Sequence, residues 1–553
     1  MTATPASDPI AALRDAVLGA TATVDAKAGA KLSLERPPKP ELGDYSTNAA
    51  MLLAPVAGAP PREVAERLRT ELDRILGASA ERIEVAGPGF LNVFLSDRWH
   101  RDAVADLLAA GDALGASAAE TPEPVLVEFV SANPTGPVTA ASGRGAAFGD
   151  AVAALLAHSG HTVEREYYLN DAGSQVRLFA ESIAARMRGA EPPADGYSGE
   201  YVAELGAELA AGGADADDLD RLERLGTESM RVRIQATLER FGVDFDTWSS
   251  ERELRESGAM ERTLDRLRES GHTYEREGAL WLRTTEFGDD KDRVLVRSDG
   301  KPTYFAPDIA YHLDKLARGH ERLINVLGAD HHGYVPRMRA ALAALGFEPE
   351  RFEALIMQMV NIVEGGQRSR MSKRRGDFVT LEELMDDIGV DATRFFILQR
   401  SHDTAFDLDL ELARSASQDN PVYYVQYAHA RIASILRKAA DEGVAASAEE
   451  IASRASAPEA LAAAAEPTER ALVRRLLELP GEVRTAAARR APHRICAYAM
   501  ATAADFHAFY RDCRVVGAPE AGAEAARLGL CVATMRTIAT TLGLLGVSAP
   551  ERM

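Results

Sequence analysis

The chain has 553 residues, 46% hydrophobic and 27% charged, which is the composition of a folded protein too long for a single core. Its formal charge of −21 excludes a protein that binds polyanions through overall positive charge, although a local basic patch would still allow contact. The start lacks the features of a secretory signal, no stretch approaches about 18 consecutive apolar residues, and Cys496, Cys513 and Cys531 have no CxxC spacing. We therefore expect a cytoplasmic protein with no membrane span, disulfide framework or zinc site.

Residues 1–112 form the first predicted unit, a small α+β domain. Helical patterns at 9–20 and 61–77 precede RIEVAGPGFLNVFLS (82–96), which predicts a strand, a Gly-Pro-Gly turn and a second strand. The stretch ELGDYSTNAAMLLA predicts a turn and a helix start, with Ser46 or Thr47 as the N-cap.

Residues 113–408 form the second predicted unit, a Rossmann-type α/β domain. The apolar stretch PVLVEFVSAN predicts a buried parallel strand, GRGAAFGDAVAALLAHSG a helix and HTVEREYYLN the next strand, which together make a βαβ unit. A charged, Ala-rich stretch at about 187–260 predicts a helical insertion. The segment DRVLVRSDGKPTYFAPD resembles a hairpin turning at Asp299-Gly300, and RLINVLGAD and FEALIMQMVNIV predict two further buried strands.

Residues 409–553 form the third predicted unit, an all-α bundle. Helical patterns cover 410–438, 468–488, 492–512 and 520–546, and no internal repeat is present. On the first of these helices, Tyr423, Tyr427 and Arg431 fall at i, i+4 and i+8 on one face. Taken alone, that spacing favours core packing over a binding surface.

The loop SANPTGPVTAASGRGAAFGD, residues 131–150, joins the first strand of the βαβ unit to its helix. Its small residues, including Gly136 and Ala141, allow a ligand to approach the backbone, the helix start offers N–H groups to a phosphate, and Arg144 adds a cation. A tight structural βα turn explains the same features, and these residues alone favour that interpretation.

Two later stretches carry polar residues suited to a nucleotide. In NVLGADHHGYVPR, Gly328 and Asp330 follow a predicted strand, where a carboxylate can bind ribose hydroxyls. His331 and His332 could bind a metal, but no other ligand cluster has suitable spacing, so polar ligand contacts or local structure are favoured. The basic stretch QRSRMSKRRG, residues 367–376, is either a solvated loop or a phosphate-binding one.

Four residues could recognise a cationic side chain. Glu128 lies in the apolar strand, where a lone carboxylate is costly unless it is paired, and Asn133 follows it. Tyr304 and Asp308 flank the start of the helix PDIAYHLDKLARG. A guanidinium ligand would suit these groups. An internal salt bridge to one of the chain's arginines would equally explain them, and the residues alone do not separate the two.

From about Leu42 to Met553 the chain resembles bacterial arginyl-tRNA synthetases, which are class I aminoacyl-tRNA synthetases. The segments that carry the resemblance are GDYSTNAAM, PGFLNVFLS, VEFVSANPTGP, GRGAAFGDA, EYYLNDAGSQV, YFAPDIAYH, NVLGADHHGYVPR, MSKRRGDFVTLEEL, DNPVYYVQYAHARI, FHAFYRDCRVV and LGLLGVSAPERM. Each segment is weak evidence alone, but their number and order make the set highly specific.

The resemblance implies the reaction and its partners. L-arginine and ATP, with Mg²⁺, would give arginyl-adenylate and pyrophosphate, and the arginyl group would then pass to the 3′ end of tRNA(Arg). It implies a monomer that uses no zinc and binds neither DNA nor membranes. The N-terminal unit would contact the tRNA elbow, and the bundle would bind the anticodon.

The resemblance also implies roles for particular residues. Arginine binding would fall to Glu128, Asn133, Tyr304 and Asp308. ATP binding would fall to Pro134, Gly136, Ala141, Gly328, Asp330, His332, Met371 and Lys373, and tRNA binding to Tyr423, Tyr427 and Arg431. Catalytic roles would fall to Thr139, Ser142, Arg144, Arg370, Ser372 and Lys373, with Lys373 neutralising the leaving pyrophosphate and Arg370 standing where the family usually has lysine.

One departure from the family lies at Thr139-Ala140-Ala141-Ser142, where the usual pattern is His-x-Gly-His. Hydroxyls replace the imidazoles that donate to the ATP phosphates, and the loss of one such donor costs ~3 kcal/mol, or about a hundredfold in rate. Either Arg144 and the helix N-terminus compensate, or the chain is an impaired paralogue that binds arginine or tRNA without charging it.

Overall fold

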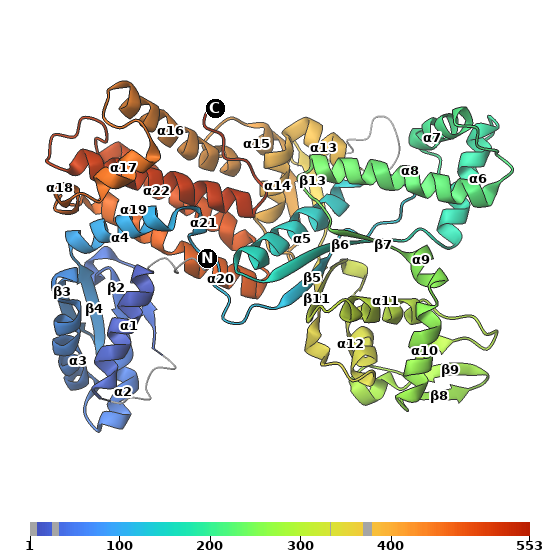
Figure 1. Ribbon diagram of the computed structural model, residues 1–553, viewed down its shortest axis with the longest axis horizontal. Helices are drawn as coiled ribbons and strands as arrows, with labels where there is room; N and C mark the ends of the chain where they lie inside the picture. The colour runs from blue at the N-terminus through green and yellow to red at the C-terminus, as the bar shows by residue number, and fades with distance from the viewer. Residues whose placement is uncertain (1–7, 25–31, 332, 369–378) are drawn as a thin grey trace.

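The computed structural model describes residues 8–24, 32–331, 333–368 and 379–553 (Figure 1). His332, Arg370, Met371, Ser372 and Lys373 therefore lie outside the described residues. Among the described residues, no helix combines the length and the apolar character that a membrane crossing needs. The predicted multidomain architecture, with an α/β centre and a helical C-terminal bundle, is confirmed.

The N-terminal domain is built on a four-stranded antiparallel sheet. Its strand order is β1 (Leu34–Glu35), β2 (Tyr45–Thr47), β4 (Phe90–Leu95) and β3 (Ala80–Ala86), and its helices are α1 (Pro9–Ala22), α2 (Ala49–Ala57) and α3 (Pro61–Leu76). The predicted hairpin is confirmed by the β3–β4 register, which pairs Ile83 with Val93. The predicted cap at Ser46 or Thr47 is wrong, because both residues lie in β2 and Asn48 is the N-cap of α2.

A five-stranded parallel sheet forms the centre of the molecule (Figure 1). Its order is β12 (Phe352–Met357), β11 (Arg322–Gly328), β5 (Pro124–Glu128), β6 (Thr162–Leu169) and β7 (Thr247–Ser250). Helix α5 (Ala140–His158) connects β5 to β6 and approaches the sheet closely, since a Cβ at Gly149 would lie 2.2 Å from Cγ of Phe129. The Rossmann-type prediction for this domain is thereby confirmed.

Two insertions extend from this sheet. The first is a helical arm of α6 (Ser174–Met187), α7 (Glu200–Ala211) and α8 (Leu219–Arg240). The second contains α9 (Glu251–Glu256), α10 (Ala259–Glu269) and an antiparallel sheet of β8 (Thr273–Arg276), β9 (Ala279–Leu282) and β10 (Arg293–Val296). The predicted helical insertion at 187–260 thus holds a strand, β7, which closes the edge of the parallel sheet. Helices α11 (Phe305–Ala317) and α12 (Tyr334–Ala344) flank β11 in the sequence.

Residues 352–363 were expected to form one buried strand but form two, in different sheets. Strand β12 ends at Met357, and β13 (Val360–Glu364) pairs with β14 (Gln367–Arg368) and β15 (Phe406–Asp409). Apolar residues continue through the break because each strand buries part of its length, so composition alone hides the turn at Gln358 and Met359.

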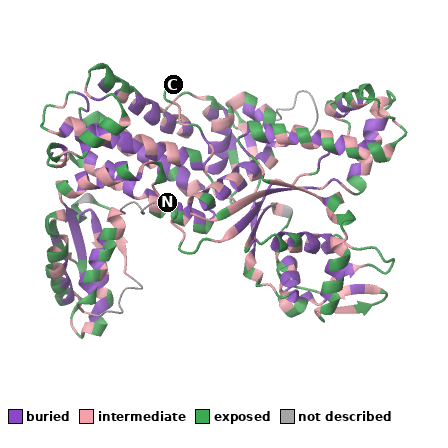
Figure 2. Cartoon of the chain, viewed as in Figure 1, coloured by how far each residue is buried: buried purple, intermediate pink, exposed green. Residues whose placement is uncertain are grey.

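Helices fill the rest of the chain, and Figure 2 shows buried residues running through them. They are α13 (Leu381–Ile388), α14 (Val390–Leu398), α15 (Leu410–Arg414), α16 (Pro421–Asp441), α17 (Ala448–Ala455), α18 (Pro458–Leu461), α19 (Pro467–Leu477), α20 (Leu479–Arg489), α21 (His493–Asp512) and α22 (Ala523–Leu544). Helix α4 (Asp97–Ala110) packs on this bundle, where Arg101 and Arg527 both bond the buried Glu469. The structure therefore groups α4 with the bundle, whereas the sequence placed the first boundary at residue 112.

Candidate active site

Open α/β sheets form a ligand-binding crevice at the carboxyl ends of the strands where the strand order reverses, and here it reverses between β5 and β11. The chain continues from β5 to β6 on one side, whereas β11 returns much later to the other side, so the order reverses at β5. Glu128 and Asn325 are paired in register near the carboxyl ends of these strands. Open parallel sheets bind ligands at such a reversal, and Glu128 and Gly328, which the sequence predicted as site residues, end β5 and β11.

The backbone after β5 is strained. Val130 and Ser131 have φ of 68° and 42°, in the left-handed region that a β-branched residue such as valine rarely enters. The loop is held from β6, because the Tyr167 hydroxyl bonds both the N–H and the carbonyl of Ala132 and Tyr168 N donates to Ser131 Oγ at 3.2 Å. Strain of this kind marks a segment whose geometry is fixed by its surroundings, as is common at functional sites.

Residues Thr139 to Ser142, here called the signature segment, form the N-cap and first turn of α5. Thr139 Oγ1 accepts from Ser142 N at 3.1 Å and lies 3.1 Å from Ser142 Oγ. Ala140 N donates to Val379 O at 2.9 Å and Gly143 N to Thr139 O at 2.9 Å. Within the described chain this leaves the exposed Ala141 N–H without a hydrogen-bond partner, which suits a phosphate oxygen.

The guanidinium of Arg144 is buried and surrounded by backbone carbonyls. Nη1 donates to Gln358 O at 2.5 Å and Met359 O at 3.2 Å, and Nη2 donates to Ser401 O and Thr404 O, both at 2.9 Å. Burial lowers the pKa of Arg144 to about 10. This arrangement does not match the expected free cation for a phosphate; instead, Arg144 holds the turn between β12 and β13.

A cavity of about 320 Å³ opens beside the start of α5. It is lined by Ala141, Arg144, Gly328, Ala329, Met357, Gln358, Met359 and Val360. The structure thus brings Ala141 together with Gly328, two of the predicted nucleotide-binding residues. Pro134 and Gly136 do not line this cavity, and a Cβ on Gly136 would lie 3.3 Å from the Tyr201 hydroxyl, which donates to Thr135 O at 2.7 Å.

Glu128 is buried and already has partners on both carboxylate oxygens. Oε1 accepts from Ser131 Oγ at 2.9 Å, and Oε2 accepts from Asn325 Nδ2 at 2.8 Å and from the ammonium of Lys315. An internal salt bridge was the alternative that the sequence left open for this carboxylate. The bridge exists, but to a lysine instead of an arginine.

Asp308 lies on the same helix as Lys315, in the first turn of α11. The pKa of its carboxyl is raised to about 7, mainly by burial; Glu128 and Glu251 also raise it, while Arg337 and Lys315 lower it. Among the described residues, no hydrogen bond or ion pair satisfies this half-buried carboxylate. An acid in this state favours a cationic ligand.

The remaining predicted residues do not line the cavity beside α5. Asn133 is exposed, and Tyr304, at the N-cap of α11, has 77% of its surface exposed. Asp330 belongs to the short turn of helix Ala329–His331 that follows β11. Within the described ranges, no group of three or more His, Cys, Asp or Glu side chains is placed to hold a metal ion.

Sequence reasoning missed Lys315, Asn325 and two tyrosines that line the acidic crevice. The Tyr168 and Tyr311 rings lie 4.3 Å apart, and Tyr311 donates to Glu166. A signal was present, because Asp308, Tyr311 and Lys315 recur at helical spacing and face one side of α11. Lysine is rarely buried, however, so the pattern favoured a solvated face.

A second polar surface lies on the bundle. The Tyr423 and Tyr427 rings stack 6.2 Å apart on α16, and the Arg431 guanidinium lies 5.0 Å from the centre of the Tyr427 ring and 5.5 Å from that of Tyr510. His507 on α21 lies 5.9 Å from Tyr427. These side chains are half-buried or exposed, so they line a surface and do not belong to the core.

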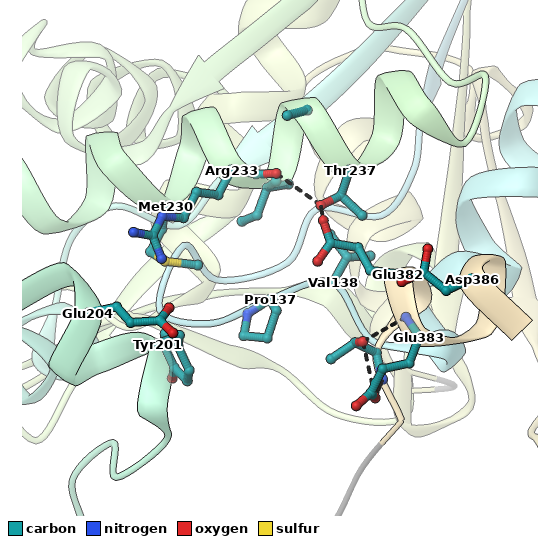
Figure 3. Close-up of a pocket in the computed structure, with 13 residues that line it drawn as sticks. Pro137, Val138, Tyr201, Glu204, Met230, Arg233, Thr237, Glu382, Glu383 and Asp386 are labelled. Carbon is teal, nitrogen blue, oxygen red and sulfur yellow. Dashed lines mark hydrogen bonds between the residues drawn. The ribbon is translucent and has the colours of Figure 1, made fainter. Parts of the chain in front are cut away.

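A separate pocket of about 480 Å³ lies between the helical arm and α13 (Figure 3). Its floor includes Pro137 and Val138, which immediately precede the signature segment, and its acidic side chains serve the fold. Thr237 Oγ1 donates to Glu382 at 2.9 Å, and Glu383 completes the capping box of α13. None of the predicted site residues lines this pocket.

Comparison with known proteins agrees over the whole chain. Three family descriptions match: "Arginyl tRNA synthetase N terminal domain" over residues 10–95, "tRNA synthetases class I (R), catalytic domain" over 213–432 and "DALR anticodon binding domain" over 425–553. The chain is 46% identical to the arginine–tRNA ligase of Shouchella clausii over 553 residues, covering 98% of each, and 46% identical to that of Geobacillus kaustophilus over 532 residues, covering 94% of each. The arginyl-tRNA synthetase structure of Thermus thermophilus superposes with a TM-score of 0.76 at 26% identity, covering 98% of this chain and 100% of that one.

Proposed function

The chain belongs to the arginyl-tRNA synthetase family and is an arginine–tRNA ligase, and we propose that the crevice between β5 and β11 is its site of arginine activation. The reaction joins L-arginine to the α-phosphate of ATP and then transfers the arginyl group to the 3′ end of tRNA(Arg). The observation that supports this site is the register of β5 and β11: Glu128, whose charge acts on Asp308, lies opposite Asn325 on the strand whose last residue, Gly328, lines the cavity with Ala141.

Recognition of the arginine side chain falls to the acidic end of the crevice. The guanidinium pairs with Asp308, whose carboxylate has no other salt bridge in the described structure, and takes the remaining lone pair of Glu128. Asn133 and Tyr304, which are exposed, bind the polar end of the amino acid. A neutral side chain of similar length would leave the Asp308 carboxylate without a cation, so the site rejects it.

Nucleotide binding uses the start of α5 and the end of β11, which line the cavity. The Ala141 N–H and the start of α5 face the phosphates, and Gly328 lets the ribose approach the backbone. The family resemblance adds Asp330 and His332 to the nucleotide-binding residues. Pro134 and Gly136 shape the approach to this cavity. Thr139 caps the helix by accepting from Ser142 N, and the hydroxyl protons of Thr139 and Ser142 rotate toward the phosphates when ATP is bound.

The chemistry is in-line displacement. A carboxylate oxygen of arginine attacks the α-phosphorus, the bond to the bridging oxygen breaks and pyrophosphate leaves; the terminal ribose hydroxyl then attacks the arginyl carbonyl and AMP leaves. Positioning and charge stabilisation supply most of the acceleration. By the family resemblance, Lys373 and Arg370 neutralise the leaving pyrophosphate, Ser372 shares the catalytic role and Met371 contributes to ATP binding, and Mg²⁺ enters with ATP. No zinc is needed at any step.

The bundle surface binds tRNA. Tyr423 and Tyr427 offer stacking faces, and Arg431 offers a cation for a phosphate. We also propose that the enzyme is cytoplasmic, acts as a monomer and contacts neither DNA nor membranes.

Charging of tRNA(Arg) with labelled arginine and ATP tests the proposal. The expected result is charging that Lys373→Ala abolishes while tRNA binding persists. Tight tRNA binding by the wild type without any charging would overturn the catalytic assignment and leave the impaired paralogue.

A further inference from the structure

Lys315 carries an ammonium group with no solvent exposure, since its side chain has 0% of its surface exposed. It lies seven residues after Asp308 on α11, so the two side chains share one face of the helix. A lysine is buried in this way only when its charge is compensated. The group that compensates the charge, Glu128, is part of the proposed arginine site.

Three groups surround the ammonium. Lys315 Nζ contacts Glu128 Oε2, lies 3.5 Å from Asn325 Oδ1, and sits 4.1 Å from the centre of the Tyr311 ring. Asn325 also donates to Glu128 Oε2, while Ser131 donates to Oε1. A carboxylate has about four acceptor positions, so three are filled before any substrate arrives and one on Oε1 stays free.

Titratable groups surround Glu128 on several elements. The acids and bases are Glu166 on β6, Glu251 and Arg255 on α9, Asp308, His312 and Lys315 on α11, and Arg337 on α12; the tyrosines are Tyr168 on β6, Tyr311 on α11 and Tyr334 on α12. Arg255 is paired with Glu251, and Arg337 lies over the Tyr334 ring. Lys315 is therefore the cation in direct contact with Glu128 among the described residues.

We propose that Lys315 is a positioning residue for arginine recognition: its ammonium, with Asn325 and Ser131, fixes the Glu128 carboxylate for the incoming guanidinium. The inference deepens the proposed function and rests on it. Without the ammonium, the carboxylate keeps only two neutral donors and is free to turn away from the substrate. A carboxylate that is not held in place binds the guanidinium less tightly.

Calorimetry of arginine binding to the full chain tests the proposal. Lys315→Met keeps the length of the side chain and removes its charge; Lys438→Met, at an exposed lysine on α16, is the matched control. The expected result is an affinity about tenfold weaker in Lys315→Met. The control is expected to match the wild type.

A double variant separates positioning from a merely structural role. If Lys315 acts through Glu128, then Lys315→Met combined with Glu128→Gln binds arginine no worse than Glu128→Gln alone. The double variant also removes both charges of the Lys315–Glu128 pair, so it folds even if Lys315→Met does not. Additive losses, or a Lys315→Met affinity equal to that of the wild type, would overturn the inference. A wild type that does not bind arginine overturns the proposed function as well.

Discussion

Thr139 and Thr380 form an isolated antiparallel bridge that ties the first turn of α5 to the start of α13. Two hydrogen bonds flank the bridge, from Ala140 N to Val379 O and from Leu381 N to Val138 O, both at 2.9 Å. A Cβ on Gly143 would lie 2.7 Å from Leu381 Cδ1, so the two segments are also in close contact. These contacts hold the signature segment in a fixed position against the start of α13.

Thr139→Ala is expected to lower the free energy of unfolding by about 1 kcal/mol, because Thr139 Oγ1 caps α5. Thr139→Ser retains the capping oxygen and is expected to keep most of that stability. Urea unfolding of both variants checks this, with pyrophosphate exchange as the activity readout. An alanine variant as stable as the wild type would show that the hydroxyl does not cap the helix.

Arg144→Lys is expected to raise the KM for ATP about tenfold, because one ammonium cannot reach the four carbonyls that the guanidinium spans. The turn at Gln358 and Met359 lines the nucleotide cavity, so its displacement acts on ATP before it acts on arginine. Arg240→Lys, at an exposed pair with Asp386, serves as the control. An unchanged KM for ATP in Arg144→Lys would contradict this role.

The KM for arginine is expected to fall as the pH rises from about 6 to about 8 and then to level off. The pKa of the Asp308 carboxyl is raised to about 7, mainly by burial. Below that pH the carboxyl is protonated and does not attract the guanidinium of arginine. Steady-state kinetics across this range checks the prediction. A KM for arginine that is flat across the window would count against Asp308 as the guanidinium partner.

Asp308→Asn is expected to stabilise the fold while abolishing arginine binding. The folded pKa of Asp308 lies above its unfolded value, so the folded state binds the extra proton and this residue lowers stability progressively as the pH rises from about 4 to about 7. Asparagine removes that cost. The gain in melting temperature over the wild type is therefore expected to be small at about pH 4.5 and largest above about pH 7; an equal gain at both would refute the assignment.

Tyr427→Ala is expected to raise the KM for tRNA, with little effect on the KM for arginine, because its ring stacks on Tyr423 and supports Arg431. Tyr427→Phe keeps the ring and is expected to retain most tRNA affinity. Arg431→Ala is expected to reduce the salt dependence of tRNA binding by about one ionic contact. Filter binding at several salt concentrations measures both effects.

The sequence predicted the parts of the fold that rest on local patterns. The apolar run ending at Glu128, the Gly-Pro-Gly turn and the long bundle helices all carry signals within a few residues. Thr247–Ser250 was missed because a four-residue strand between charged helices has no period of its own. The turn at Gln358 was missed because its cause, Arg144, lies 214 positions away.

The candidate site divides in the same way. Glu128 and Asp308 stay predictions as site residues: an acid in an apolar strand marks Glu128, and a family motif marks both. The packing of β5 against α11 and β11 decides that Glu128 is paired to Lys315. The same packing leaves Asp308 without a partner among the described residues. No spacing within one segment encodes that packing, so the state of each carboxylate could only be seen in three dimensions.

The crevice also has a consequence for synthesis on the ribosome. Glu128 and Asn325 face each other across strands that are 197 positions apart in the chain. At about 5–20 residues per second, β5 waits on the order of ten to forty seconds for the strand that covers its second edge. During that interval its apolar residues, Val125 to Val127, are an open edge to which another nascent chain can add. The N-terminal domain, whose sheet closes within residues 34–95, is complete before that interval begins.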